Sequence, residues 1–306
     1  MIAGVPRPDQ RARPTGQKGE TGTPPPPSED NRAVDSAADF KRFESEGWGE
    51  RADTYGVLTG AISSRAAEAL LAAADVGPDV RLLDVGCGTG ELMSAAVARG
   101  ATAVGVDLSE GMLEVARSTH PGLEFRRGDA EDLPFGDGEF QAATAAFLLN
   151  HVPRPPQAVA EALRVLEPGG RAAFAVWDRP ERTPFMGLIG EAIEEAGVDS
   201  EASVPAGGPD PFRYADESEF RALLAGAGFA RVEVGTLEVV HRASSAADLW
   251  EGILGGTVRA SARVLAQPPE VRERIRAAFE RRAERLRDGN SIALPAGIKL
   301  AAGRRP

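Results

Sequence analysis

Residues 81–91 read R-L-L-D-V-G-C-G-T-G-E and decide the fold of this chain. An apolar run ends in an acid, Asp84, and three glycines follow at alternate positions, Gly86, Gly88 and Gly90, before an amphipathic stretch begins. This order predicts a strand, a tight turn and a helix. Glycine tolerates positive φ and lets a ligand approach the main chain, and the start of a helix offers free N–H groups. The stretch therefore predicts a turn that holds a nucleoside-type ligand.

The spacing of the glycines narrows the class of ligand. The dinucleotide fingerprint has a third glycine three positions after the second, where this chain has Glu91. A carboxylate in the first helical turn already occupies the positive end of the helix dipole and would repel a pyrophosphate. A ligand with little phosphate character fits better. S-adenosylmethionine, an adenosine that carries a sulfonium, an ammonium and one carboxylate, is such a ligand.

Composition excludes several classes of protein. The 306 residues, 42% of them hydrophobic, can bury a large core, and no apolar run approaches the length of a membrane span. The net charge of -11 argues against broad binding to nucleic acid. A single cysteine, Cys87, excludes an internal disulfide and a multi-cysteine metal site. We expect a cytoplasmic protein without a metal, a nucleic-acid partner or a membrane segment, and its oligomeric state stays open.

Strand and helix patterns alternate from residue 80 to Trp177. They predict an α/β fold: a doubly wound, mostly parallel seven-stranded sheet of Rossmann type, with an antiparallel last strand and a helical lid. Within residues 38–57 we expect helix interrupted at Gly47 and Gly49. The expected organisation is a disordered tail at 1–37, N-terminal helices belonging to the lid at 38–79, the α/β core at 80–244 with an insertion at 178–214, a helical lid insertion at 245–288 and a final core strand at 289–306.

Four polar residues fall where predicted strands end: Asp84, Asp107, Asp129 and His151. Ligands of open α/β sheets lie outside the carboxyl ends of the strands, so these side chains should line one edge. An acid that ends the second strand can accept hydrogen bonds from ribose hydroxyls. Asp129, after the next strand, can accept from an exocyclic adenine amine. Each acid taken alone could equally cap a helix or a loop.

The chain resembles a known family through four segments in this order: L-L-D-V-G-C-G-T-G, V-G-V-D-L-S-E-G-M-L, G-D-A-E-D-L-P-F and L-N-H-V-P. Together they resemble the class I S-adenosylmethionine-dependent methyltransferases, most of all the small-molecule branch that includes ubiquinone and menaquinone biosynthesis methyltransferases. The resemblance covers residues 80–178. It extends weakly over 38–79 and 215–306, where the final G-R-R-P is similar to actinobacterial members.

The resemblance implies a role for each residue that matches the family pattern. Gly86, Gly88 and Gly90 would form the turn under the cofactor, Asp84 would help hold the methionine ammonium, and Asp107 would bind the ribose hydroxyls. The remaining contacts would be Leu108 and Met112 beside the adenine, Asp129 and Ala130 at its amine edge, Phe147 at the methionyl part, and Tyr55, which would close over the cofactor.

The implied reaction is in-line methyl transfer to a small or medium, partly apolar acceptor, such as a secondary metabolite or a modified peptide. The protein has to bring nucleophile and methyl group together, with a general base if the acceptor is neutral. His151 is the best candidate for that base, although a loop histidine contacting cofactor or backbone is the plainer interpretation, and His241 is a second candidate. Aromatic residues outside the repeating core could line the acceptor pocket: Trp48, Trp177, Phe185, Phe212, Tyr214 and Trp250.

Two other functions are compatible with this sequence. One is an NAD(P)-dependent oxidoreductase on the same Rossmann architecture, against which Glu91 counts. The other is a non-catalytic protein that binds S-adenosylmethionine as a partner subunit. Glycine and acid motifs indicate binding, whereas the residues that decide catalysis lie on the acceptor side.

Overall fold

The computed structural model describes Met1, residues 29–198 and residues 203–306. Most of the tail expected over residues 1–37 lies outside these described residues, but helix α1 (Glu29–Gly49) begins inside it. The interruption expected at Gly47 is wrong, because α1 continues through it. A Cβ at Gly47 would lie 2.5 Å from Cγ1 of Val258, so this glycine lets α1 approach a neighbouring segment rather than ending the helix.

One mixed sheet forms the centre of the molecule, with the order β3-β2-β1-β4-β5-β8-β6 and a short β7 beside β8. Among the described residues its eight strands are β1 (Arg81–Val85), β2 (Thr102–Asp107), β3 (Glu124–Arg127), β4 (Phe140–Ala146), β5 (Leu166–Trp177), β6 (Ala230–Ala243), β7 (Arg287–Asp288) and β8 (Ser291–Arg304). Strands β1 to β5 pair in parallel, and β8 runs antiparallel to both β5 and β6. The expected sheet with its antiparallel last strand is confirmed; only the two-residue β7 was not predicted.

The central strands are buried on both faces. Leu82 and Leu83 are both fully buried, yet they belong to different apolar clusters, because successive side chains of a strand point to opposite faces. A parallel strand covered on both sides requires a nearly continuous apolar run, which is what β1 has. The same burial applies to β4 and β5, and it holds the polar ends of these strands at one edge.

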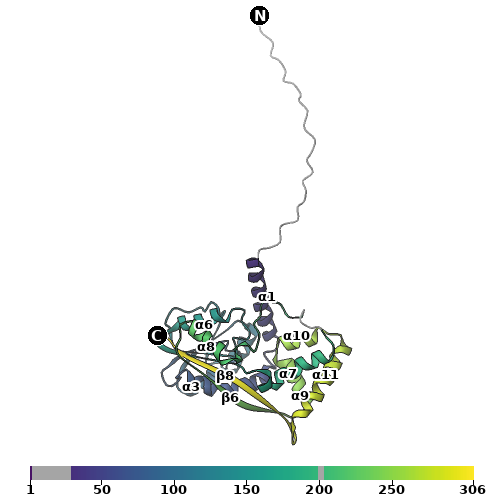
Figure 1. The fold of residues 1–306 in the computed structure, drawn as a ribbon. Coiled ribbons are helices and arrows are strands. Elements are labelled where there is room, and N and C mark those ends of the chain that lie inside the picture. Colours follow the sequence, from purple (N-terminus) through teal and green to yellow (C-terminus); the bar gives the residue numbers. More distant parts are fainter. Residues whose placement is uncertain (2–28, 199–202) are drawn as a thin grey trace.

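Helices cover both faces of the sheet (Figure 1). They are α2 (Thr59–Ser63), α3 (Ala67–Ala73), α4 (Glu91–Ala98), α5 (Glu110–Thr119), α6 (Pro155–Val165) and α8 (Glu217–Gly226). Ser109 immediately precedes α5, but its hydroxyl makes no cap and instead donates to the backbone oxygen of Ser45 at 2.8 Å. Ser45 in turn donates to the oxygen of Leu108 at 3.1 Å, so α1 is tied to the end of β2.

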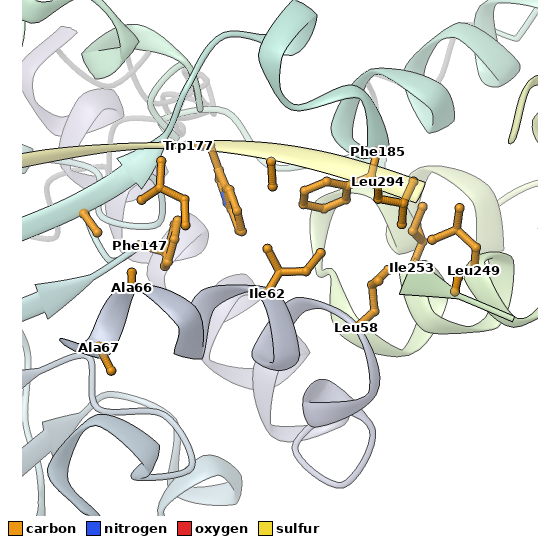
Figure 2. Close-up of a cluster of buried hydrophobic side chains, with 14 of the residues drawn as sticks. Leu58, Ile62, Ala66, Ala67, Phe147, Trp177, Phe185, Leu249, Ile253 and Leu294 are labelled. Atoms are coloured by element: carbon orange, nitrogen blue, oxygen red, sulfur yellow. The ribbon is translucent and has the colours of Figure 1, made fainter. Parts of the chain in front are cut away.

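Four further helices lie together beside one end of the sheet (Figure 1) and are called the lid helices here: α7 (Pro184–Glu195), α9 (Ala246–Gly256), α10 (Arg259–Leu265) and α11 (Pro269–Ala283). Strands β6 and β8 continue past the end of β5, where Trp177 pairs with Ile298, and they reach these helices. Figure 2 shows Leu294 of β8 beside Phe185 of α7, in one apolar cluster with Ile253 of α9. The lid helices and the core therefore share one continuous apolar interior.

In the part of the chain that the structure describes, no helix has both the length and the apolar character needed to cross a membrane.

We expect Ile298→Ala to lower the free energy of unfolding by about 3 kcal/mol, because Ile298 is fully buried in β8 and its loss leaves a cavity. Urea denaturation followed by circular dichroism measures the change. Val240→Ala is the control on neighbouring β6, where Val240 is 47% exposed and its truncation should cost much less. Equal losses for the two variants would contradict the packing described here.

Candidate functional site

The turn between β1 and α4 has three glycines with positive φ: 71° at Gly86, 53° at Gly88 and 92° at Gly90. A Cβ at Gly86 would lie 2.9 Å from Leu148, and one at Gly90 would lie 2.9 Å from the ring of Phe125. A Cβ at Gly88 would meet no atom within 4 Å. Packing therefore accounts for the outer two glycines, whereas Gly88 faces open space that a ligand could fill.

Asp107 joins this turn to the end of β2. Its carboxylate accepts hydrogen bonds from the backbone N–H of Gly88 at 3.0 Å and of Ser109 at 2.8 Å. Burial raises the pKa of Asp107, and these backbone hydrogen bonds act in the opposite direction. A carboxylate has about four acceptor positions, so Asp107 can accept further hydrogen bonds from hydroxyl groups at the sheet edge.

A cavity lies at the carboxyl ends of β1, β2 and β4, and we call it the rim cavity. Its empty volume, open mouth included, is about 920 Å³. The residues expected at the site that line it are Tyr55, Gly86, Gly88, Asp107, Leu108, Met112, Asp129, Ala130, Phe147 and His151. Residues that sequence reasoning missed also line it: Lys41, Glu44 and Ser45 of α1 and Thr59 of α2. Helix α1 is thus one wall of the site, where the sequence pattern had singled out only Trp48.

A smaller space, the carboxylate cavity, adjoins the rim cavity along Tyr55, Gly86 and Gly88. Asp84 lines it, only 2% exposed, and accepts a hydrogen bond from the Thr144 hydroxyl at 2.8 Å. Burial raises the pKa of Asp84 to about 7.

Glu91 also lines the carboxylate cavity, and its carboxylate accepts a hydrogen bond from the hydroxyl of Thr89 at 2.7 Å. Gly90 lines neither the rim cavity nor the carboxylate cavity, so the structure places it in the packing of the turn. Tyr55 lies between the two cavities and donates to, or accepts from, the Ser63 hydroxyl at 2.9 Å. Burial raises the pKa of Tyr55 to about 12, so its hydroxyl stays neutral.

The donor set suits a nucleoside that bears an ammonium group and no phosphate chain. Asp84 and Glu91 line the carboxylate cavity, whereas Asp107 and the apolar Leu108 and Met112 line the rim cavity. The lining of the carboxylate cavity, as far as the structure describes it, holds no lysine or arginine. A pyrophosphate would meet two acids there, whereas an ammonium group would be attracted.

Asp129 lies on the rim cavity with a cation already beside it. Nζ of Lys41 is 2.5 Å from Oδ2 of Asp129 and 2.6 Å from a carboxylate oxygen of Glu131, which is buried. These ion pairs tie α1 to the loop after β3. The acid expected to meet an adenine amine thus shares its charge with a lysine that the sequence pattern did not single out.

His151, after β4, is held by two residues of α1. Its Nδ1 lies 2.9 Å from a carboxylate oxygen of Glu44, and its ring meets that of Trp48 edge to face, with centroids 5.2 Å apart. The other carboxylate oxygen of Glu44 lies 3.0 Å from Nε of Arg259 on α10. Glu44 is 3% exposed, so this acid is a buried link between the core, α1 and the lid helices.

A third space, the lid cavity, lies among the lid helices and has an empty volume of about 1270 Å³, open mouth included. It shares four lining residues with the rim cavity: Trp48, Thr59, His151 and Trp177. Phe185 and Phe212 line it as expected, but Tyr214 and Trp250 do not. The rings of Tyr214 and Trp250 instead pack on Phe220 and Phe279 in the core. The sequence could not separate them from pocket residues, because aromatic residues of a core and of a pocket have the same pattern.

Phe147 lines the rim cavity in a strained conformation. Its φ is 58°, rare for a residue with a large side chain, and its ring lies 4.0 Å from that of Trp177, centroid to centroid. Figure 2 shows the two rings side by side above α2 and α3. Strain of this kind persists only where the surrounding structure imposes it, and it concentrates at functional sites.

The chain is similar in sequence to known methyltransferases. Residues 83–174 match the family model of a methyltransferase domain. A demethylmenaquinone methyltransferase of Streptomyces griseus is 33% identical over 190 residues, which are 58% of this chain and 82% of that protein. One of Clavibacter sepedonicus is 37% identical over 164 residues, 50% of this chain and 66% of that protein.

Solved structures share the fold. A Bacillus halodurans protein described as a methyltransferase has a TM-score of 0.52 at 23% identity, covering 78% of this chain and 98% of that one. The YcgJ protein of Bacillus subtilis has a TM-score of 0.52 at 19% identity, covering 79% and 98%. The family assignment sets aside the oxidoreductase and the non-catalytic alternatives. The chain belongs to the S-adenosylmethionine-dependent methyltransferases, in the small-molecule branch that includes the ubiquinone and menaquinone biosynthesis enzymes.

Proposed function

We propose that this methyltransferase acts on a small or medium, partly apolar acceptor, a secondary metabolite or a modified peptide, that binds in the lid cavity. The observation that carries the proposal is the shared boundary of the rim and lid cavities, formed by Trp48, Thr59, His151 and Trp177. S-adenosylmethionine supplies a methyl group already activated on a sulfonium. The chain has to hold an acceptor nucleophile against that boundary and exclude water from it. The relatives are named as methyltransferases of demethylmenaquinone, a molecule with an apolar ring system, and this supports an acceptor of similar character.

We propose the following roles on the cofactor side. The backbone at Gly86 and Gly88 supports the cofactor, Asp107 accepts from the ribose hydroxyls, and Asp84 attracts the ammonium group. Gly90 acts indirectly, through the shape of the turn. The other proposed contacts are Leu108, Met112, Asp129 and Ala130 around the adenine, Phe147 at the methionyl part and Tyr55 over the junction of the two cavities.

His151 is the proposed general base. When its Nδ1–H donates to Glu44, the lone pair is on Nε2, which can take a proton from the acceptor. The buried carboxylate of Glu44 also stabilises the imidazolium that forms, although it shares its charge with Arg259. His241 is the weaker candidate, because it lies on β6 and is not in the lining of any of the three cavities.

Calorimetric titration with S-adenosylhomocysteine tests the cofactor site. We expect Asp107→Ala to weaken binding by about tenfold or more, since a charge-assisted hydrogen bond is lost. Asp132→Ala removes an exposed acid from the nearby loop and should leave the affinity unchanged. A folded, ligand-free wild-type sample that gives no heat would refute the site, and an unchanged affinity of Asp107→Ala would remove that residue from it.

Affinity for S-adenosylmethionine should rise by roughly fivefold between pH 6 and pH 7, because Asp84 titrates near pH 7 and only its ionised form attracts the ammonium group. The same carboxyl group should also affect the stability of the ligand-free protein. Between about pH 4 and about pH 7 the unfolded chain has lost the Asp84 proton while the folded protein still holds it, so the free energy of unfolding should fall as the pH rises through this range. Asp84→Asn should flatten both slopes. Calorimetry and thermal melts across this range measure them, and parallel slopes in variant and wild type would count against the assignment.

His151→Gln should lower kcat by about a hundredfold or more, as expected for loss of a general base, with unchanged affinity for S-adenosylhomocysteine. A metabolite screen with the wild type first identifies an acceptor that is methylated. The rate of transfer from methyl-labelled S-adenosylmethionine to that acceptor then gives kcat. His241→Gln is the matched control and should keep its full rate. A fully active His151→Gln would leave His151 with a structural role only.

A further inference from the structure

The lid cavity carries an excess of positive charge. Among the described residues its lining includes the charged side chains of Arg259 and Arg263, but no aspartate or glutamate. The rest of the lining is largely apolar, and α7 and α9 supply a large share of it, including Phe185, Ile189, Ile193 and Ile253. Cations in an apolar space are costly unless they have partners, so the partners of each cation decide what the cavity can bind.

Arg259 has its partners within the chain. Its Nε lies 3.0 Å from Glu44, Nη1 donates to the backbone oxygen of Pro209 at 3.1 Å, and Nη2 donates to the backbone oxygen of Asn150. Its guanidinium carbon lies 5.5 Å from the centre of the Phe40 ring. The other carboxylate oxygen of Glu44 lies 2.9 Å from His151, so this buried acid of α1 lies between Arg259 and His151. Arg259 therefore holds the lid helices on α1 and is not free for a ligand.

Arg263 lies four residues further along α10, on the same face as Arg259. In the described part of the chain no acid pairs with its guanidinium, and its Nε is buried without a hydrogen-bond partner. The Arg263 charge lowers the pKa of Arg259, although burial is the larger cause of that shift. The two guanidinium groups are thus close enough to repel each other, and Glu44 compensates only one of them.

We propose that the acceptor carries an oxyanion, a carboxylate or a phosphate, which pairs with the guanidinium of Arg263 while the apolar body of the acceptor lies against α7 and α9. The guanidinium fork matches either group with two parallel hydrogen bonds. Held at that point, the apolar body extends toward the boundary formed by Trp48, Thr59, His151 and Trp177. Oγ1 of Thr59 is buried there without a partner, and it supplies a second polar contact for the acceptor. This inference rests on the proposed function, since it names the acceptor class of the same site.

The test uses three probes on one ring system: 2-naphthoate, 2-naphthyl phosphate and the neutral 2-naphthamide. Binding to the full chain is followed by tryptophan fluorescence, because Trp48 and Trp177 line the cavity, with and without S-adenosylhomocysteine. We expect at least one oxyanion to bind about tenfold more tightly than the amide, as charge-assisted hydrogen bonds imply. The probe that gains more identifies carboxylate or phosphate as the group recognised.

Three variants assign the preference to one residue. Arg263→Gln should reduce oxyanion binding to the level of the amide, and Arg263→Lys should keep part of it, because lysine keeps the charge but loses the fork. Arg285→Gln is the matched control, since Arg285 is exposed and outside the cavity lining. A preference that survives Arg263→Gln, equal binding of all three probes, or no binding of any would overturn the inference.

A second measurement needs no probe. Arg263→Met removes the charge but keeps an apolar chain, so it should raise the melting temperature of the ligand-free protein by about 2 °C or more, whereas Arg285→Met should not. A variant no more stable than its control would contradict an uncompensated charge at this position. The affinity for S-adenosylhomocysteine should be unchanged in all these variants, and it separates the two proposals. If the wild type does not bind S-adenosylhomocysteine, the proposed function is refuted, whatever the naphthyl probes show.

Discussion

The site depends on one constraint, the attachment of the glycine turn to the neighbouring strand. The N–H groups of Gly86 and Cys87 donate to the backbone oxygen of Val106, at 2.7 and 3.1 Å, and that of Gly88 donates to the carboxylate of Asp107. A buried carboxylate needs such donors, so the turn and the acid hold each other in place. Because β1 and β2 are parallel, this attachment lies at the edge where the strands end, and both adjoining cavities are built around it.

The second determinant is charge buried between segments far apart in the sequence. Helix α1 reaches the loop after β3 through Lys41 and reaches the lid helices through Glu44 and Arg259. At least one partner of each pair lines a cavity, so the contacts that join these segments also shape the binding spaces. Removing one partner would leave a buried charge uncompensated, which is far more costly than losing a surface ion pair.

The core and the lid helices line different parts of the cavities. The α/β core supplies the glycine turn and the acids, whereas α1, α7, α9 and α10 supply most of the wall of the lid cavity. The long β6–β8 pair joins the two parts with one apolar interior (Figure 2).

The sequence alone determined the order of strands and helices along the chain, the glycine turn and the acids at the strand ends. Buried parallel strands require apolar residues and positive φ favours glycine, so both features can be recognised from residue type. It could not show that Gly90 and Trp250 serve packing, since a packed residue and a ligand contact have the same letter and similar neighbours. Only the tertiary structure decided the partners of Glu44 and showed that, within the described residues, no acid pairs with Arg263. Those depend on distances between segments separated by more than a hundred residues, which no local pattern encodes.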